Sequence, residues 1–278
     1  MTALLTIITP CFNSEKTLEK TLQSVFNQSF QDWELIIVND GSTDDTEKIS
    51  LEWVQKDPRF KYFYKENGGL GKARNFGIQK AEGIYILPLD SDNIIEKDFT
   101  KDAIKVFENN KEVGVVYGNA EYFGEKTGIW KVDDYELDKL LVHNYIDACA
   151  VYRKNIWLDV KGYDENMPFQ GHEDWEFWIA LGNINIQFHH LNKVTFKYFV
   201  SSTSMIRSFT KEMTLSNQDY IVKKYSILYH NYYCRLFSKS QNANLIFSKK
   251  VKSKKFTIDL FCKTFFGFTF FKSKLDRF

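Results

Sequence analysis

The chain has 278 residues, enough for one large domain or for one domain with an appendage. Hydrophobic residues make up 44% and charged residues 26%, which is typical of an ordinary soluble protein. No stretch reaches the roughly 18 uninterrupted apolar residues of a membrane-spanning helix, and residues 1–9 predict a first strand, not a signal peptide. We therefore expect a cytoplasmic protein, peripheral at the inner face of the cell membrane.

The net charge is only +1, but it is spread unevenly along the chain. Residues 249–278 contain nine Lys or Arg, two Asp and eight Phe, so this tail is strongly basic and aromatic. Such an asymmetry predicts a tail that meets an anionic partner. The four cysteines lie far apart and form no metal or redox pair, which fits a reducing compartment.

The first 117 residues alternate between short apolar runs and amphipathic segments. Strands are expected at 4–9, 33–38, 60–64, 84–89 and 113–117. Helices are expected at 14–27, 44–55, 72–81 and 98–109. This alternation predicts an α/β fold with a doubly wound, mainly parallel sheet.

The alternation loosens in the second half of the chain. We expect an antiparallel ribbon at 118–131, a short helix at 138–141, a strand at 147–152, a helix from 171, and two strands at 186–188 and 194–199. From residue 211 the pattern is helical, including a helix at 256–271. The expected division is a catalytic domain at 1–207 and a helical, basic-aromatic extension at 208–278.

Two carboxylates follow the apolar run at residues 84–89. Asp90 and Asp92 emerge where open α/β sheets bind their ligands, at the carboxyl end of a strand. In an extended segment, residues two apart point the same way, so both carboxylates would face one cation. The hard cations Mg²⁺ and Mn²⁺ suit such oxygens. The structural alternative is a polar turn ahead of the next helix.

Three further polar clusters have both a functional and a structural interpretation. Asp40, after the second strand, would accept a hydrogen bond from a ribose or a base, or would only form a turn. Glycines at 68, 69 and 71 would let backbone amides approach a phosphate, but the pattern does not follow the first strand, which argues against NAD. Glu173 and Asp174 would supply a general base, or would only favour the start of a helix through its dipole.

Taken together, five short motifs in a fixed order resemble family 2 glycosyltransferases of the GT-A fold. The motifs are Thr9-Pro10-Cys11-Phe12-Asn13-Ser14-Glu15, Val38-Asn39-Asp40-Gly41-Ser42, Asn67-Gly68-Gly69 with Ala73-Arg74-Asn75, Leu89-Asp90-Ser91-Asp92, and Gly171-His172-Glu173-Asp174-Trp175. The resemblance runs from about residue 4 to residue 205. It implies an inverting transferase that uses a nucleotide-diphospho-sugar.

The resemblance also implies a role for each matching residue. The residues implied for the nucleotide are Thr9, Phe12, Asn13, Glu15, Asp40, Asn67, Arg74, Asp90 and Ser91. Asp92 would ligate Mn²⁺ or Mg²⁺, together with Asp90. Asp174 would deprotonate the acceptor hydroxyl, and Glu173 would support it.

The chain departs from the family pattern in three respects, two of them near this site. Asn93 stands where many relatives have a further carboxylate, and the run from Tyr198 to Ser201 lacks a His that many relatives carry. A low metal affinity, or replacement of that His by the nearby His172, would follow. The Gln-Xaa-Xaa-Arg-Trp signature of processive synthases is also missing, which favours addition of a single sugar.

The sequence thus predicts transfer of one sugar, from a UDP-sugar by preference, to a glycan or lipid-linked acceptor in surface polysaccharide, lipopolysaccharide or capsule synthesis. The basic, aromatic tail is expected to bind the membrane surface, because its large apolar area adds more to lipid binding than to nucleic-acid binding. The first alternative is a catalytically silent relative that binds nucleotide-sugar as a scaffold. The second is a nucleic-acid-binding protein, whose binding would depend steeply on salt; we expect no nucleic-acid partner.

Overall fold

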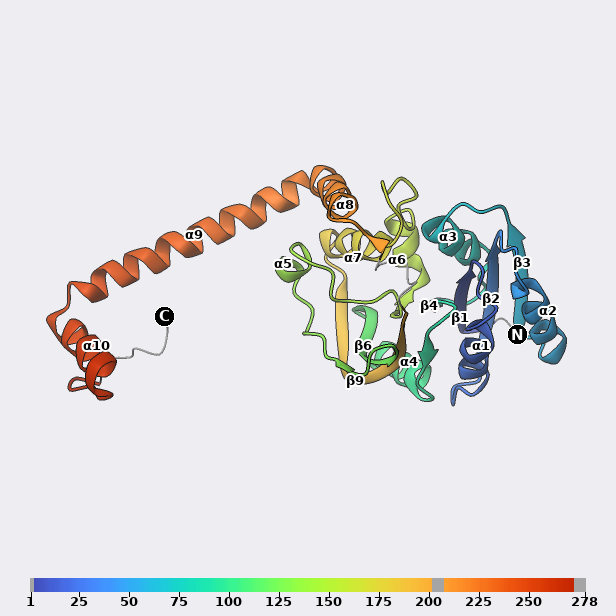
Figure 1. The fold of residues 1–278 in the computed structure, drawn as a ribbon, viewed down its shortest axis with the longest axis horizontal. Helices are drawn as coiled ribbons and strands as arrows, with labels where there is room; N and C mark the ends of the chain where they lie inside the picture. Colours follow the sequence, from blue (N-terminus) through green and yellow to red (C-terminus); the bar gives the residue numbers. More distant parts are fainter. Residues whose placement is uncertain (1–2, 202–207, 273–278) are drawn as a thin grey trace. The chain divides into compact units, whose positions relative to one another are not determined.

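The computed structural model describes residues 3–201 and 208–272, and the chain forms two compact units, Met1–Lys224 and Tyr225–Phe278 (Figure 1). The domain boundary expected after residue 207 falls at the edge of a stretch outside the described residues. The helix that follows this stretch, α8 (Lys211–Lys224), belongs to the first unit.

The first unit is built on a nine-stranded mixed sheet, ordered β3-β2-β1-β4-β8-β6-β9-β5, with β7 paired to β6. The strands are β1 (Leu5–Cys11), β2 (Trp33–Asp40), β3 (Phe60–Lys65), β4 (Tyr85–Pro88), β5 (Ile94–Ile95), β6 (Val113–Gly124), β7 (Gly128–Trp130), β8 (Val151–Arg153) and β9 (Gln187–Val200). The pairs β3–β2, β2–β1, β1–β4 and β6–β9 are parallel, whereas β8 runs antiparallel to both β4 and β6. The predicted α/β class is therefore confirmed, and the sheet is mixed beyond β4.

Helices connect the strands and cover both faces of the sheet. In the first unit they are α1 (Leu18–Phe26), α2 (Thr46–Lys56), α3 (Leu70–Lys80), α4 (Phe99–Asn109), α5 (Leu137–Leu140), α6 (Lys154–Asp159), α7 (Glu173–Asn183) and α8. Alternate residues of each strand point to opposite faces, so β1 contributes Leu5 and Ile7 to the core beneath α1 and α4.

On the other face, α3 lies very close to β1 and β2. A Cβ atom at Gly77 would lie 2.8 Å from Cγ2 of Ile8 and 2.9 Å from Cγ2 of Val38. Side chains essentially never come this close, so a residue without a side chain is needed here. The contact holds the N-terminal end of α3, which carries Arg74, over the sheet.

The parallel strands β1, β2 and β4 end at the same edge of the sheet. Cys11 and Asn39 are aligned in β1 and β2, and Ile8 is aligned with Pro88 in β4. The chain segments that leave this edge carry the motifs singled out in the sequence. Because these strands end together, the segments that follow them leave the sheet at one edge. This edge is where the sequence predicted the site, at the carboxyl ends of the strands.

Several element boundaries differ from those expected. Helix α1 begins at Leu18, not at Ser14, because Ser14 turns the chain: its carbonyl accepts the amides of Thr17 and Leu18, and its hydroxyl lies 2.7 Å from Ser91 Oγ. The two strands expected at 186–199 are one long strand, β9. Ile84, expected in a buried strand, is exposed and precedes β4.

The second unit contains α9 (Ser226–Val251) and α10 (Lys254–Phe266). Helix α10 ends before the expected residue 271 because Gly267 adopts a left-handed conformation (φ 77°), which ends a helix readily. The buried Asp259 then accepts the amides of Phe270 and Phe271, at 2.6 and 2.8 Å, which folds this segment back onto α10.

Large apolar side chains remain exposed on both helices of this unit and on the segment after α10. They include Tyr233, Leu236, Phe237, Leu245, Ile246, Ile258, Phe261, Phe265, Phe266, Phe268, Phe270 and Phe271. Among the described residues, none of the helices combines the length and the hydropathy that crossing a bilayer would require. Lys274, Arg277 and Phe278 of the predicted tail lie outside the described residues.

Candidate active site

A cavity of about 530 Å³ opens beside the carboxyl edge of the sheet in the first unit. Its walls come from the end of β1, the turn after β4, α3, the segment 130–148, the start of α7, the end of β9, and α8. The predicted site residues that line it are Phe12, Arg74, Asp90, Ser91, Asp92, Glu173 and Asp174. The structure therefore gathers the motif of Asp90 and Asp92 and the motif of Glu173 and Asp174, which lie about 80 residues apart, around one cavity.

Asp90 and Asp92 sit in a tight turn, not in the extended segment that the sequence suggested. The amide of Asn93 donates to the carbonyl of Asp90 at 3.1 Å, which closes the turn. Both carboxylates still line the cavity, and a guanidinium nitrogen of Arg74 lies 2.7 Å from Asp90 Oδ1. Only 2% of the Arg74 side chain is exposed, so a buried cation holds the Asp90 carboxylate in place.

Two further contacts hold this turn in place. Asn93 is buried, and its side-chain oxygen accepts the amide of Phe199 at 3.0 Å, which joins the turn to the end of β9. Ser91 is held by the hydroxyl of Ser14. Asn93, which stands where many relatives have a further carboxylate, thus has a structural role that a side-chain amide fulfils.

Asp92 is the carboxylate whose environment suits a cation. Burial, together with the nearby charge of Asp90, raises the pKa of Asp92 to about 7. Within the described residues, no cluster of three or more His, Cys, Asp or Glu side chains has the geometry to hold a metal ion. One or two carboxylates completed by substrate phosphates is, however, the usual arrangement for Mg²⁺, so the residues present fit a cation that binds together with a phosphorylated ligand.

Asp174 lines the same cavity from the first turn of α7. Its Oδ2 accepts the side-chain amide of Asn144 at 3.0 Å, and its Oδ1 accepts the backbone amide of Trp175 at 2.7 Å. Burial raises the pKa of Asp174 to about 7; the Glu173 carboxylate adds to this effect and the Arg74 guanidinium opposes it. A carboxylate that gains and loses a proton near neutral pH is suited to general-base catalysis.

Glu173 is more deeply buried than Asp174, with 2% of the residue exposed. Its Oε2 accepts the amide of Gly171 at 2.6 Å, whereas its Oε1 is buried and finds no hydrogen-bond partner in the described part of the chain. This carboxylate therefore shapes the entry into α7 and the charge around Asp174.

Sequence reasoning missed a fifth acidic residue of the cavity, Asp147. It precedes β8, and its Oδ1 accepts the amide of Cys149 at 2.9 Å. Burial and the charges of Asp90 and Asp174 raise the pKa of Asp147 well above its ordinary value. No motif signalled this residue, because it comes from a segment that the sequence placed in a strand.

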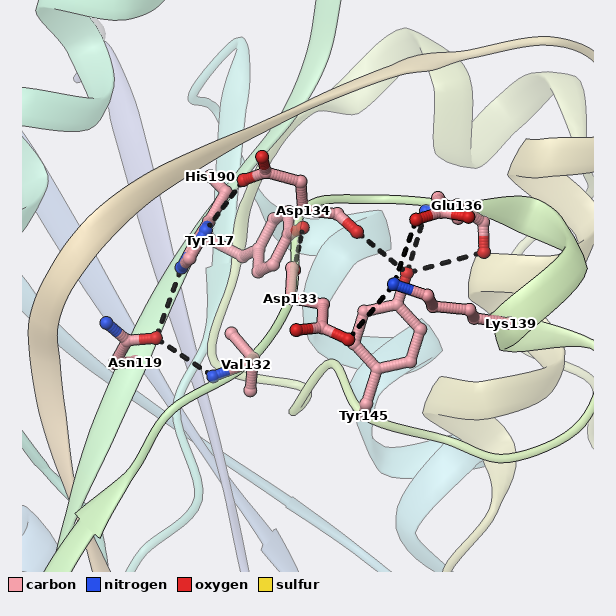
Figure 2. Close-up of polar contacts among 9 residues, drawn as sticks. All are labelled: Tyr117, Asn119, Val132, Asp133, Asp134, Glu136, Lys139, Tyr145 and His190. Atoms are coloured by element: carbon pink, nitrogen blue, oxygen red, sulfur yellow. Dashed lines mark hydrogen bonds and ion pairs between the residues drawn. The ribbon is translucent and has the colours of Figure 1, made fainter. Parts of the chain in front are cut away.

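The segment that leads to Asn144 and Asp147 is fixed by a polar network (Figure 2). Asn119 Oδ1 accepts the amide of Val132 at 3.0 Å and lies 3.1 Å from His190 Nε2. Tyr117 donates to the carbonyl of Asp133 at 2.8 Å. Figure 2 also shows the Tyr145 hydroxyl, which accepts the amide of Glu136 at 2.9 Å. These bonds tie the irregular segment to β6 and β9 and so hold Asn144 beside Asp174.

Five residues expected around the nucleotide do not line the cavity in this structure. They are Thr9, Asn13, Glu15, Asp40 and Asn67. Their polar atoms mainly bind neighbouring loops: Asn13 Oδ1 accepts the amide of Thr43, Glu15 Oε2 accepts the amide of Asp45, and Asn67 donates to the carbonyl of Asp40. Thr9 is fully buried, and its hydroxyl has no partner among the residues described.

Asp40 has the most complete set of bonds of these five. Its two carboxylate oxygens accept the amides of Gly68 and Gly69, at 3.0 and 2.8 Å, and form an ion pair with Lys65. The carboxylate therefore folds the glycine-rich loop that precedes α3.

Helix α8 supplies a wall of the cavity through Thr214 and Gln218. It is anchored by Lys224, which forms ion pairs of 2.5 Å with Asp164 and 2.8 Å with Glu176. Nothing in the sequence pattern distinguished this helix from the following ones, because its polar contacts are made to α7 and to the loop before it, between 45 and 60 residues earlier in the chain.

The fold and the cavity together define the GT-A class of α/β glycosyltransferases. The model of Glycosyl transferase family 2 matches residues 6–161, more than half of the chain. The chain therefore belongs to glycosyl transferase family 2.

Curated relatives are similar over different shares of their length. A glycosyltransferase of Rickettsia typhi, RT0329, is 31% identical over 201 residues, which cover 67% of this chain and 61% of that protein. Glycosyltransferase GlyA of Streptococcus pneumoniae is 37% identical over 127 residues, 45% of this chain and 18% of that protein. The hyaluronan synthase of Pasteurella multocida is 25% identical over 82% of this chain but only 24% of its own length. The chain thus spans between about a fifth and three fifths of these relatives.

Solved structures agree with the fold. Staphylococcus aureus TarS 1–349 in complex with UDP has a TM-score of 0.59 and 25% identity, and the match covers 73% of this chain and 61% of that one. The mannosyltransferase PcManGT of Pyrobaculum calidifontis, in complex with GDP-Man and Mn²⁺, has a TM-score of 0.56 and 16% identity over 73% of this chain and 59% of that one, and supports the fold alone. The expected family and fold are confirmed.

Replacing Asp147 with Asn should stabilise the ligand-free protein, and more so at high pH. The raised pKa means that the folded state favours the protonated carboxyl, a contribution that is lost as the pH rises. Asn stays neutral and can still accept the amide of Cys149. With a chelator present, we expect the gain in Tm over wild type to be about 2–4 °C larger at pH 8.5 than at pH 5, equivalent to ~1 kcal/mol. A gain independent of pH would show that the charge of Asp147 is not buried.

Proposed function

We propose that this family 2 glycosyltransferase moves one sugar from a UDP-sugar to a hydroxyl of a glycan or lipid-linked acceptor, with inversion, in surface polysaccharide synthesis. The observation that carries the proposal is the convergence of Asp90, Asp92 and Asp174 on one cavity beside the buried Arg74. Similarity to TarS, which was crystallised with UDP, supports a uridine nucleotide.

Asp174 would act as the general base. An inverting displacement needs one base on the side opposite the leaving group, and Asp174 lies on α7 while Asp90 and Asp92 follow β4. With a pKa of about 7, its carboxylate is available at neutral pH and retains enough basicity to take a proton from a hydroxyl in the transition state. Asn144 orients it through the 3.0 Å bond to Oδ2.

Asp92, together with Asp90, would hold a divalent cation, Mn²⁺ or Mg²⁺. When bound, the cation supplies positive charge to the diphosphate that leaves as the glycosidic bond breaks. Arg74 holds Asp90 in place by its 2.7 Å contact, and although burial disfavours the charged guanidinium, the nearby carboxylates, Asp90 first, raise its pKa, so it stays protonated. Positive charge near the leaving group stabilises the transition state more than the ground state.

The nucleoside would lie along the loops after β1 and β2. Phe12 lines the cavity and is half exposed, which leaves its ring free to contact a base. Asn13, Glu15, Asp40 and Asn67 are assigned to this region through the family pattern, and their loops border the same edge of the sheet. The assignment of Thr9 and Ser91 rests on the same pattern.

The second unit would bring the enzyme to its acceptor at the membrane. Between residues 225 and 278 the sequence has eleven Lys or Arg against two Asp. Exposed phenylalanines on α10 alternate with lysines such as Lys255 and Lys263, the composition of helices that lie in a bilayer interface.

The proposal is tested first by thermal shift with UDP, GDP, CDP and their sugars, with and without Mn²⁺. A ligand that binds only the folded state raises the Tm, by about 2.7 kcal/mol of stability at 100 times its Kd. We expect one nucleotide to stabilise the wild type in a manganese-dependent manner. Asp92→Ala should lose the dependence on Mn²⁺, whereas Glu112→Ala, an exposed carboxylate remote from the cavity, should retain it. No shift with any nucleotide would contradict the donor site.

Asp174→Asn should abolish catalysis without weakening donor binding. Asn cannot accept the proton, so we expect release of nucleoside diphosphate from the donor to fall by about 10²–10⁴-fold while the nucleotide-induced shift in Tm persists. In the wild type, kcat/KM should fall tenfold per pH unit below about pH 7, since only the deprotonated carboxylate is active. Glu108→Gln, on the exposed side of α4, serves as the control. Full turnover by Asp174→Asn would remove the residue from the mechanism, and donor binding without turnover in the wild type would favour the silent scaffold.

Deleting residues 249–278 should weaken binding to anionic vesicles. Sedimentation with phosphatidylglycerol vesicles would be compared with sedimentation with phosphatidylcholine vesicles, for the full chain, the deletion and a variant with Lys252, Lys254 and Lys255 changed to Gln. Each lysine near an anionic surface contributes about 1 kcal/mol, so both variants should lose binding to the anionic vesicles. Unchanged sedimentation of the deletion variant would refute the membrane role.

A further inference from the structure

A histidine at the entrance to α7 is held in one defined orientation by a buried amide of α8. His172 lines the cavity, directly before Glu173 and Asp174. Its ring packs edge-to-face against Trp175, at 5.6 Å between ring centroids, and against Phe209, at 5.0 Å. Its Nδ1 lies 3.0 Å from the side-chain nitrogen of Asn217, a residue of α8 that is fully buried.

The orientation of the Asn217 amide is determined by its other partners. Its Oδ1 accepts the backbone amide of Phe169 at 2.9 Å, and its Nδ2 donates to the carbonyl of the same residue at 2.8 Å. A backbone N–H can only donate and a carbonyl can only accept, so the oxygen and nitrogen of this side chain cannot be exchanged. The second hydrogen of Nδ2 therefore points to His172.

This arrangement sets the protonation of the imidazole. Nδ1 of His172 faces a donor and must accept, which leaves the ring hydrogen on Nε2. Burial lowers the pKa of His172, which favours the neutral ring. Among the residues that the structure describes, Nε2 has no hydrogen-bond partner, although the ring lines a cavity whose charged groups are mostly carboxylates.

We propose that His172 is a neutral hydrogen-bond donor whose Nε2–H binds an oxygen of the nucleotide-sugar, either of the diphosphate or of the sugar. The proposal rests on the proposed function, since it names a substrate contact in the same cavity. It also assigns Asn217 as a positioning residue that acts only through His172. A metal role for His172 is excluded in this arrangement, because Nδ1 is occupied by Asn217 and Nε2 carries the hydrogen.

The contact would add a hydrogen-bond donor to a cavity that is rich in carboxylates. Arg74 already pairs with Asp90, so a diphosphate that enters the cavity meets more carboxylates than cations. A neutral N–H adds a donor without another titrating charge beside Asp174. It also links donor binding to α8, because the residue that orients the imidazole lies on that helix.

The first test measures the tautomer directly. In protein labelled with ¹⁵N-histidine, the resonances of His172 are assigned by their loss in His172→Gln. We expect a protonated Nε2 and an unprotonated Nδ1 at pH 7.5 in the ligand-free protein. Asn217→Asp, which offers no donor to Nδ1, should shift the population towards the other tautomer or the imidazolium. Asp219→Asn, an exposed change on the same helix, should leave the spectrum of His172 unchanged. A predominant Nδ1–H tautomer in the wild type would overturn the proposal.

The second test separates the Nε2 donor from the rest of the ring. The side-chain amide of Gln reaches the position of Nε2, whereas that of Asn reaches only the position of Nδ1. Calorimetric titration with the nucleoside diphosphate that the wild type prefers, and with its sugar, should show His172→Gln within about twofold of wild type. His172→Asn should bind about fivefold to tenfold more weakly, the worth of one net hydrogen bond.

The ligands distinguish the two sources of the oxygen. Weaker binding of both ligands by His172→Asn assigns the contact to the diphosphate, and weaker binding of the nucleotide-sugar alone assigns it to the sugar. Equal loss in the Gln and Asn variants, loss in neither, or reduced Mn²⁺ affinity in the presence of nucleotide would overturn the proposal. If the wild type binds no nucleotide, the proposed function fails, and the tautomer measurement still decides the role of Asn217.

Discussion

The ion pair between Arg74 and Asp90 is the interaction on which the cavity depends. The guanidinium is almost completely buried, and the carboxylates of Asp90, Asp174 and Glu173 all raise its pKa. Removing one partner of such a pair leaves an uncompensated charge in a poorly solvated place, which is far more costly than the pair itself. Arg74 is held over the sheet because α3 packs closely on β1 and β2 at Gly77. The packing of α3 on the sheet therefore positions the buried positive charge of the cavity.

Around this cation lie several buried acids. Arg74 pairs directly with Asp90, whereas burial raises the pKa values of Asp92, Asp147 and Asp174, and the charge of Asp90 adds to the effect at Asp92 and Asp147. Asp92 and Asp174 thus have similarly raised pKa values but lie on different elements, the turn after β4 and the first turn of α7. In the proposed mechanism a bound cation would favour the ionised form of Asp92, whereas Asp174 would take up a proton from the acceptor.

The sequence alone predicted the parts of this architecture that depend on local patterns. The alternation of β-branched runs with amphipathic helices located the first four strands, and Asp90, Asp92 and Asp174, which line the cavity, were singled out because they follow strand ends or begin a helix. Asp147 and Asn217 escaped prediction, because neither has a local signature. Asp147 matters through burial beside Asp90, and Asn217 through bonds to a loop 48 residues earlier. Tertiary contacts of this kind cannot be read from spacing. The extended geometry assumed for Asp90 and Asp92 was also wrong, since the amide of Asn93 closes a turn there.

The aromatic residues of the cavity wall have an optical consequence. Two of the six tryptophans of the chain, Trp130 and Trp175, line the cavity, and Trp130 stacks on Tyr122 with an angle of 1° between the rings. Trp175 donates to the carbonyl of Leu140 at 2.6 Å, so its indole is rigidly placed. Indole emission responds to the polarity of its surroundings, and a ligand that displaces water from the cavity changes those surroundings for both rings. The site thus contains its own fluorophores, and its occupancy can be followed in the native chain without a label.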